Sequence, residues 1–408
     1  MAVHDIDTMK IIRSELDKID PSILVYGEGW NGGDSSLPDD KKALKANMPK
    51  FEKLQIAAFS DDIRDGIKGH VFEPNTPGFV NGFKGLEEVV KFGVVASTKH
   101  DGISYSGGPN QFSGYGTAPW ANEPYQTITY TSAHDNFTLW DKLQTTNPEA
   151  SKEELTAMNK MAAAIVLTSQ GIPFFQAGEE MARTKVKEDG TFEENSYKSP
   201  DSVNSLKWNR KEEYKDLFDY YKGLISLRKS HKIFRMNTKE DIQKNLTFLE
   251  KGKNFNEDNI VAYTLNGSDL NDDWKRAAVI FNANNEDVKV TLPEGNWTVV
   301  VNDQKAGVDS LGTIDGNEII VKGKSSYVLV GSEGIKKEDS IIENNNQGTN
   351  INDSDKSNDI SKDKNDKNTS GIKENKVKTS DVNYGFYFVI ALCSLGVTAV
   401  TSKKKVHI

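Results

Sequence analysis

The sequence has almost no cysteine. Cys393 is the single cysteine among 408 residues, so a disulfide framework within the chain is excluded. The six histidines and this cysteine show no spacing typical of zinc ligands, and we expect neither a metal site nor an organic cofactor. Only a structural calcium ion, which binds dispersed oxygen ligands, is left open.

Positive charge is also in deficit. The chain has 51 Lys and Arg residues against 60 Asp and Glu, which gives a net charge of −9 and a sequence pI of about 5.4. Because binding of nucleic-acid phosphates requires basic patches, nucleic acid is not an expected partner. A neutral polysaccharide requires aromatic rings and hydrogen-bonding groups in a groove, and the six tryptophans and thirteen tyrosines permit such a groove.

Aromatic residues are missing from one long segment. Residues 333–381 contain no Phe, Trp or Tyr and are rich in Asn, Asp, Ser and Lys. Such a segment buries too little apolar surface to fold, so residues 333–383 are predicted to form a disordered polar spacer.

A long apolar run without charge lies near the C-terminus. Residues 384–402 make up nineteen uncharged positions, enough for one transmembrane helix. The basic tail, residues 403–408, begins with three lysines and would hold this end in the cytoplasm, with the rest of the chain outside. We therefore expect an extracellular protein on the cell surface, anchored in the bilayer through residues 384–402.

A spacer, an apolar segment and a short basic tail resemble the cell-wall sorting signals of Gram-positive bacteria. Those signals carry a Leu-Pro-x-Thr-Gly pentapeptide before the apolar segment. The corresponding stretch from Lys376 to Ser380 keeps only the threonine. Anchoring in the membrane is therefore expected rather than attachment by sortase.

Two apolar, strand-like stretches end in groups of polar residues. Ile23 to Val25 leads into Tyr26-Gly27-Glu28-Gly29-Trp30, and residues 127–133 are closed by His134-Asp135-Asn136. In a (β/α)8 barrel the catalytic groups lie at the C-terminal ends of the strands. Two carboxylates at strand ends indicate acid–base chemistry on a glycosidic bond.

Predicted strands and helices alternate over residues 1–235, which is the pattern of a parallel α/β barrel. The region opens with a predicted helix at residues 8–18, capped by Asp5. Predicted strands follow at residues 23–28, 54–59, 127–134 and 172–176, with long helices at 152–168 and 214–229.

The pattern changes at residues 236–332 to short β-rich runs separated by turns such as Asn266-Gly267. These runs predict a small antiparallel β-sandwich that serves packing and stability. The predicted strands are residues 246–249, 260–264, 277–281, 297–301, 319–321 and 327–330.

The two polar clusters are followed by the segment Gly171-Ile172-Pro173-Phe174-Phe175-Gln176-Ala177-Gly178-Glu179-Glu180. In this order the motifs resemble those of the second half of type I pullulanases, over residues 1–330. Type I pullulanases are debranching hydrolases of the α-amylase superfamily that cleave α-1,6 bonds in pullulan, starch and glycogen. The resemblance implies that residues 1–235 are the C-terminal half of a catalytic TIM (β/α)8 barrel and residues 236–332 an all-β domain.

The resemblance also implies roles for residues of the motifs. Glu28 would be the general acid/base, which protonates the glycosidic oxygen and later deprotonates water. Asp135 would grip the distorted sugar and stabilise its oxocarbenium-like transition state. Substrate contacts are expected from six further residues, namely His134, Trp30, Asn195, Tyr197, Asp201 and Asn204.

Two further segments match the family less closely. Glu179 and Glu180 follow the last predicted strand, where pairing with Arg183 and contact with substrate both fit the sequence. The segment from residue 59 to 65 resembles a loop after the sixth barrel strand. Ser60 and Asp62 stand where pullulanases tend to show Asn and Arg.

The family's nucleophilic aspartate lies in an Arg-Phe-Asp-Leu-Met-like segment just before a His-Asp pair. The first residues, Met1 to Asp5, match the end of that segment, so no nucleophile is expected in this chain. We therefore expect the C-terminal part of a retaining pullulanase, inactive by itself, whose partners are an α-glucan and a separate N-terminal half. Two alternatives stay open, a hydrolase of α-1,4 bonds from the same superfamily and a non-catalytic, membrane-anchored glucan-binding remnant.

Overall fold

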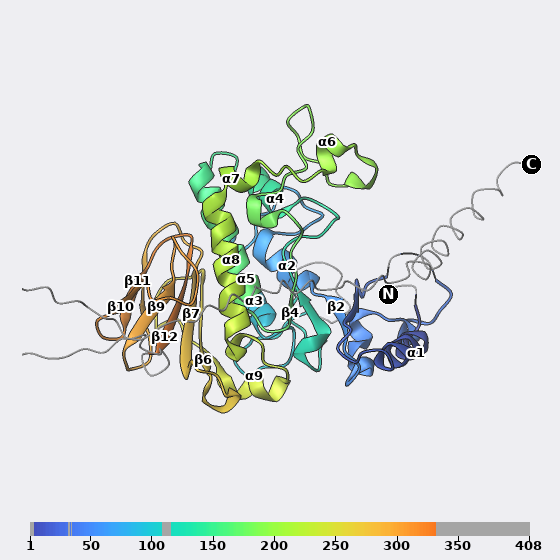
Figure 1. Ribbon diagram of the computed structural model, residues 1–408, viewed down its shortest axis with the longest axis horizontal. Coiled ribbons are helices and arrows are strands. Elements are labelled where there is room, and N and C mark those ends of the chain that lie inside the picture. Colours follow the sequence, from blue (N-terminus) through green and yellow to red (C-terminus); the bar gives the residue numbers. More distant parts are fainter. Residues whose placement is uncertain (1–3, 32, 34, 108–115, 332–408) are drawn as a thin grey trace, which may run out of the picture. The chain divides into compact units, whose positions relative to one another are not determined.

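The structure is a computed structural model that describes residues 4–31, 33, 35–107 and 116–331 (Figure 1). The predicted spacer, transmembrane helix and basic tail lie outside the described residues. Within the described part, no helix combines the length and the apolar character needed to cross a membrane.

A sheet of parallel strands lies in the first part of the chain. Its strands follow chain order, β1-β2-β3-β4, and each neighbouring pair is parallel, in agreement with the predicted α/β class. Each strand is shorter than its predicted run, because residues at one or both ends of the run lie outside the hydrogen-bonded ladder. The strands are β1 (Val25–Gly27), β2 (Ile56–Phe59), β3 (Thr127–Thr129) and β4 (Ile172–Pro173).

The long helices agree with the prediction. α5 (Lys152–Thr168) has the predicted bounds, and α8 (Lys215–Ser230) is shifted by one residue. α5 begins with a capping box, in which the Ser151 hydroxyl accepts from the Glu154 amide and the Glu154 carboxylate accepts from the Ser151 amide. α1 (Ile6–Asp17) is capped by Asp5, as predicted, with Thr8 N 2.7 Å from Asp5 Oδ1.

The prediction of a loop after residue 60 is wrong, because α2 (Asp61–Lys68) begins directly after β2 and is buried along its whole length. The remaining α-helices are α3 (Glu87–Val94), α4 (Leu139–Thr146), α6 (Asp201–Asn204), α7 (Arg210–Glu213) and α9 (Lys239–Asn245). Short 3-10 helices are Asp39–Lys41, Lys45–Phe51, Pro124–Gln126, Glu179–Met181, Ser196–Lys198, Lys232–Phe234 and Ser268–Leu270.

The second part of the chain forms antiparallel sheets, as predicted. One sheet has the order β10-β9-β12-β7-β6-β5, and a smaller one pairs β11 with β8. Prediction missed β8 and β10, because charged Lys289 interrupts the first and the second is short and largely exposed. The strands are β5 (Leu246–Phe248), β6 (Ile260–Asn266), β7 (Arg276–Asn282), β8 (Val288–Thr291), β9 (Trp297–Val301), β10 (Gly312–Ile314), β11 (Glu318–Val321) and β12 (Ser325–Gly331).

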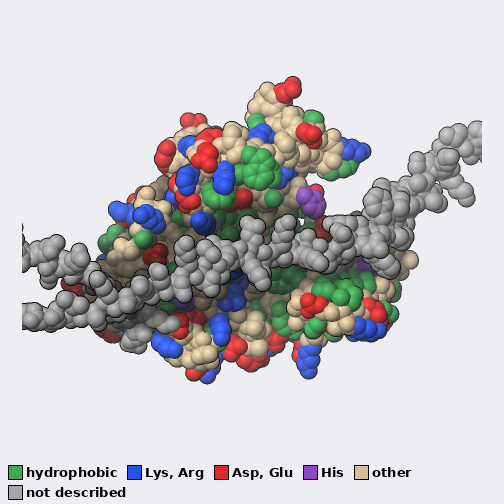
Figure 2. All heavy atoms as spheres, in the orientation of Figure 1, with side chains coloured by type: hydrophobic (Ala, Val, Ile, Leu, Met, Phe, Trp, Pro, Cys, Tyr) green, Lys and Arg blue, Asp and Glu red, His purple; other side chains and the backbone are tan. Residues whose placement is uncertain are grey.

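The larger antiparallel sheet is buried on both faces. Val261, Tyr263 and Val279 point towards the helical side, where α5 packs on β7 and β12 (Figure 1). Ile260 and Ile280, at the alternate positions, belong to the core shared with β8 and β11. Burial of both faces explains why these strands are nearly continuous apolar runs. Figure 2 shows acidic and basic side chains interspersed over the visible face of the protein.

Candidate active site

Glu28 follows the last residue of β1, at the carboxyl end of the parallel sheet. The next residue, Gly29, has a φ of 74°, which glycine adopts without strain. A Cβ at this position would lie only 2.7 Å from the Cβ of Ala58 on β2. Gly29 therefore lets the chain turn closely over β2, and the Lys45 amide fixes the turn by donating to the Gly29 carbonyl.

His134 and Asp135 lie on the connection between β3 and α4, which we call the Asp135 loop (residues 130–138). Their side chains are 81% and 63% exposed, and His134 Nε2 lies 3.4 Å from Asp135 Oδ2. Asn136 has a φ of 59°, a left-handed conformation that asparagine tolerates better than most residues. The loop ends at Thr138, whose hydroxyl accepts from the Asp141 amide and caps α4.

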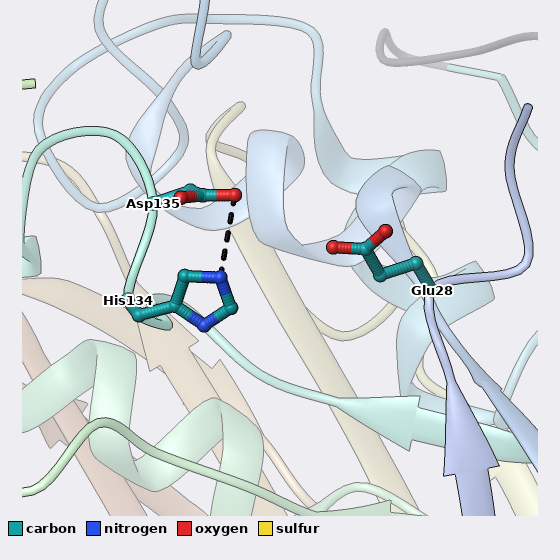
Figure 3. A group of neighbouring side chains, drawn as sticks. All are labelled: Glu28, His134 and Asp135. Atoms are coloured by element: carbon teal, nitrogen blue, oxygen red, sulfur yellow. Dashed lines mark ion pairs between the residues drawn. The ribbon is translucent and has the colours of Figure 1, made fainter. Parts of the chain in front are cut away.

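The two loops bring the predicted acidic residues together. One side-chain oxygen of Glu28, one of Asp135 and a ring nitrogen of His134 all lie within 4.8 Å of one another. Figure 3 shows the Glu28 carboxyl group facing the other two side chains from the end of its strand. The two carboxylates thus follow strands that are separated by one strand, β2.

These residues line a cleft with a volume of about 640 Å³. Trp30 and Phe72 also line it, together with four further aromatic rings whose contacting pairs have centroids 4.8 Å to 6.4 Å apart. These four rings stand at or next to the carboxyl end of each parallel strand and belong to Tyr26, Phe59, Tyr130 and Phe174. Sequence analysis missed them, although an aromatic residue at the same place in four successive strands is a readable signal.

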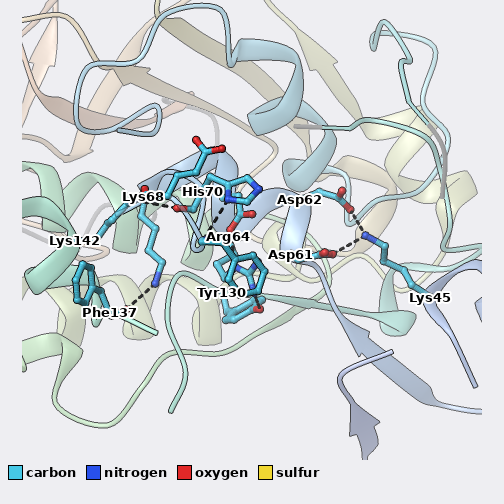
Figure 4. A network of polar contacts seen from close by, with 12 residues as sticks. Lys45, Asp61, Asp62, Arg64, Lys68, His70, Tyr130, Phe137 and Lys142 are labelled. Atoms are coloured by element: carbon cyan, nitrogen blue, oxygen red, sulfur yellow. Dashed lines mark hydrogen bonds and ion pairs between the residues drawn. The ribbon is translucent and has the colours of Figure 1, made fainter. Parts of the chain in front are cut away.

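Cations from α2 form part of the cleft wall, which sequence analysis also missed. Arg64 donates to Asp65 Oδ1 at 2.7 Å and to the Tyr130 hydroxyl at 3.0 Å. Lys68 donates to the Phe137 carbonyl of the Asp135 loop at 2.9 Å (Figure 4). Burial lowers the pKa of Lys68 to about 7.

A second polar cluster is centred on Lys45, the residue whose amide donates to the Gly29 carbonyl (Figure 4). Lys45 Nζ lies 2.6 Å from Asp61 Oδ1 and 3.2 Å from Asp62 Oδ2, and Trp120 Nε1 donates to Asp62 at 3.0 Å. Burial raises the pKa of Asp62 to about 7. Asp62 and Ser60, at the two positions that depart from the family pattern, are thus buried in the interior.

The structure does not pair Arg183 with Glu179, which was one of the two roles left open for Glu179 and Glu180. Glu179 is 3% exposed and accepts hydrogen bonds from the hydroxyls of Thr131, Ser132 and Tyr221. Arg183 donates instead to backbone carbonyls, those of Ala177 and Asn204. Glu179 therefore ties the Asp135 loop to α8, a role for a buried carboxyl group that the sequence did not indicate.

Of the four residues after residue 190 that were predicted to line the cleft, the structure places only one in it. Asn195 lines the cleft. Tyr197 is 71% exposed, and Asp201 is the exposed first residue of α6. The Asn204 amide group donates to the carbonyls of Ser196 and Ser199, so it holds its own segment together. Among the lining residues of the described cleft, the last three are absent.

A model of the all-β domain of pullulanases matches residues 242–305. The pullulanase of Bacillus subtilis strain 168 is 36% identical over 293 residues, which make up 72% of this chain and 37% of that protein. The solved pullulanase from Bacillus acidopullulyticus matches with a TM-score of 0.69 at 38% identity, covering 79% of this chain and 36% of that one. The chain belongs to the pullulanase family.

A second solved pullulanase, from Paenibacillus barengoltzii in complex with maltohexaose and alpha-cyclodextrin, matches with a TM-score of 0.68 at 39% identity. That match covers 80% of this chain and 46% of the other. The chain thus spans between 36% and 46% of the length of these three pullulanases.

Glu28, His134 and Asp135 are also close enough together to hold a metal ion. In the part of the chain that the structure describes, no fourth His, Cys, Asp or Glu joins this group. Calcium takes six to eight oxygen ligands and structural zinc takes four, whereas this group offers only three ligands, of which Glu28 is half-buried and the other two are exposed. In this pullulanase homologue the geometry suits acid–base chemistry better.

Proposed function

We propose that this chain carries the acid/base and the substrate-stabilising carboxylate of a hydrolase that cleaves α-1,6-glucosidic bonds in pullulan, starch or glycogen. The observation that carries the proposal is the approach of Glu28, which follows β1, and of His134 and Asp135, on the loop after β3, to within 4.8 Å of one another. The aromatic lining of the cleft supports it, because aromatic faces suit the apolar faces of sugar rings.

In the proposed reaction Glu28 donates its proton to the glycosidic oxygen as the bond from that oxygen to the sugar breaks. Glu28 then takes a proton from the water that hydrolyses the glycosyl–enzyme ester, which returns the enzyme to its starting state with retained configuration. Asp135 stabilises the positive charge that develops on the sugar. His134, Trp30 and Asn195 contact substrate from the cleft wall.

The attacking carboxylate is proposed to come from polypeptide outside this chain. A retaining glycosidase holds its nucleophile about 5–5.5 Å from the acid/base. The carboxylates that line the described cleft are Glu28, Asp135 and Glu194, and Glu194 does not follow a parallel strand. We propose further that β1 to β4 are half of a (β/α)8 barrel, since β1 and β4 each pair with one strand of the described sheet.

Supplying the missing part tests the proposal. Coexpression of this chain with the N-terminal half of a pullulanase, including its Arg-Phe-Asp segment, should yield maltotriose release from pullulan. Glu28→Gln should then lower turnover about a thousandfold or more while maltotetraose affinity changes only a few-fold. Glu318→Gln, an exposed β11 residue paired with Lys289, is the matched control and should leave turnover unchanged. Near-normal turnover in Glu28→Gln would remove Glu28 from the mechanism.

Glucan binding without catalysis is a second candidate, favoured by the lack of a further strand-end carboxylate among the described cleft residues. It requires that the chain bind maltotetraose and that no N-terminal half restore turnover. Comparison of products from pullulan and amylose separates α-1,6 from α-1,4 cleavage in an active complex.

The location of the protein is also a proposal. We propose that residues 384–402 anchor it in the membrane with the cleft outside the cell, on the strength of nineteen uncharged residues followed by three lysines. Deletion of residues 384–402 should move the protein from the membrane fraction to the soluble fraction. Retention in the membrane fraction would overturn the assignment.

A further inference from the structure

The Asp135 loop lies over a buried ammonium group. Lys185 Nζ donates to the carbonyls of His134 at 3.3 Å, Asn136, and Glu194 at 3.4 Å. An ammonium group has three N–H donors, so these three carbonyls use all of them. The Lys185 residue is 1% exposed, so it acts from beneath the cleft surface and does not reach the solvent above it.

The three carbonyls belong to two different segments of the chain. Two of them flank Asp135 in the chain, and the third directly precedes Asn195, which also lines the cleft. A single side chain thus joins the loop that carries Asp135 to the segment that carries Asn195. The rings of Phe137 and Phe192, with centroids 6.1 Å apart, join the same two segments.

Lys185 is itself held in place. Its backbone amide donates to Asp141 Oδ2 at 2.8 Å, and the neighbouring Thr184 hydroxyl donates to Asp141 Oδ1. Asp141 lies in the first turn of α4, the helix that follows the Asp135 loop. The lysine is therefore fixed to the rigid element that ends the loop.

A second buried lysine also holds the loop. Lys68 on α2 donates to the Phe137 carbonyl at 2.9 Å (Figure 4). Burial lowers the pKa of both lysines, because an ammonium group taken out of water loses hydration that uncharged carbonyls only partly replace. Burial of two ammonium groups beside one loop costs free energy. This cost indicates that the position of the loop matters for the function of the protein.

We propose that Lys185, assisted by Lys68, is a positioning residue that holds Asp135 and His134 against Glu28 and couples this loop to the Asn195 segment. The link to catalysis rests on the proposed function. The positioning of the loop by Lys185 does not depend on the proposed function, because it concerns the loop geometry alone.

Lys142 offers a matched control. It is also a buried lysine whose ammonium group donates to three carbonyls, those of His70, Glu73 and Pro74 at 2.6 Å to 3.0 Å. It holds a different loop, residues 70–74. The variants Lys185→Met and Lys142→Met therefore remove the same kind of contact from two different places.

Hydrogen–deuterium exchange and maltotetraose titration of the full chain in detergent test the proposal. In Lys185→Met, exchange over residues 130–138 should become at least tenfold faster, and maltotetraose affinity should fall at least tenfold. In Lys142→Met, exchange should rise over residues 70–74 and stay unchanged over 130–138. Lys185→Arg, which keeps the charge and the donors, should recover part of the affinity.

Unchanged exchange over residues 130–138 in folded Lys185→Met would overturn the proposal. If that variant does not fold, Lys68→Met decides, since it removes the Phe137 contact alone and should speed exchange around residue 137. Normal exchange there would also overturn it. If the unaltered chain does not bind maltotetraose, the proposed function fails, while the exchange measurements still decide whether the lysines hold the loop.

Discussion

Two acidic residues that follow neighbouring strands have opposite environments. The Asp135 side chain is 63% exposed and faces Glu28 in the cleft. Glu179 is fully enclosed, and burial raises its pKa although three hydroxyl donors oppose the shift. Because Asp135 is exposed beside Glu28, its carboxylate is free to interact with a positive charge that develops on a substrate. The carboxylate of Glu179 already accepts hydrogen bonds from within the protein.

Asp135→Asn is expected to act on the transition state. In the coexpressed complex it should lower turnover by several orders of magnitude with little change in the Michaelis constant, because its charge is needed only as the sugar becomes cationic. Steady-state kinetics on pullulan measure this, with Asp309→Asn, an exposed substitution in the all-β part, as the control. An effect confined to the Michaelis constant would make Asp135 an ordinary binding residue.

Lys68 should make stability depend on pH. Its pKa of about 7 in the folded chain lies below its ordinary value of 10.5, so between these values the unfolded chain binds more protons. The free energy of unfolding contributed by Lys68 therefore rises with pH over this window, by roughly 2 kcal/mol between pH 7 and 9.

Urea denaturation at pH 7 and 9 checks this expectation. The difference in unfolding free energy between the unaltered chain and Lys68→Met should shift by that amount in favour of the unaltered chain at pH 9. Lys142→Met serves as the comparison, because burial lowers the pKa of Lys142 only to about 8. A difference that does not change with pH would show that burial does not lower the pKa of Lys68 into this range.

At the scale of elements, local sequence signals define α5 more sharply than the strands. Its capping box satisfies two backbone amides at the first turn, which fixes where the helix begins. We expect Ser151→Ala to lower the free energy of unfolding by about 1 kcal/mol. Ser151→Asp, which keeps an acceptor at the cap, should be nearly neutral in the same denaturation measurement, and equal losses in both variants would contradict the capping explanation.

At the scale of the whole molecule, the parallel sheet has two edges. β1 and β4 each pair with a single described strand, and Leu24 and Tyr26 beside and within β1 are 41% and 47% exposed. Unpaired edges and apolar side chains in water favour association. Residues 1–332 produced alone should therefore sediment as oligomers or aggregates and release no maltotriose from pullulan.

Sedimentation velocity and a maltotriose assay measure both expectations. Addition of a separately produced N-terminal pullulanase half should reduce the association and restore activity. Maltotriose release by the purified, monomeric fragment would show that the nucleophile lies within this chain, and the roles of the carboxylates would then need to be reassigned.

Local sequence patterns were sufficient for most of the long elements and for the prediction that Glu28 and Asp135 lie close together. The bounds of α5, the cap of α1 and the parallel strands follow from capping residues and apolar runs, which act over a few neighbours. Glu28 and Asp135 were found because each ends an apolar stretch, and parallel strands bring such ends to one side of a sheet.

Tertiary structure alone decided the partners of the buried polar groups. Glu179 bonds to Tyr221 on α8, and Lys185 and Lys68 bond to carbonyls of the Asp135 loop. A backbone carbonyl leaves no trace in the sequence, since every residue has one. The sequence therefore does not distinguish a buried lysine from an exposed one. Only the packing of distant segments shows which lysines hold the loop.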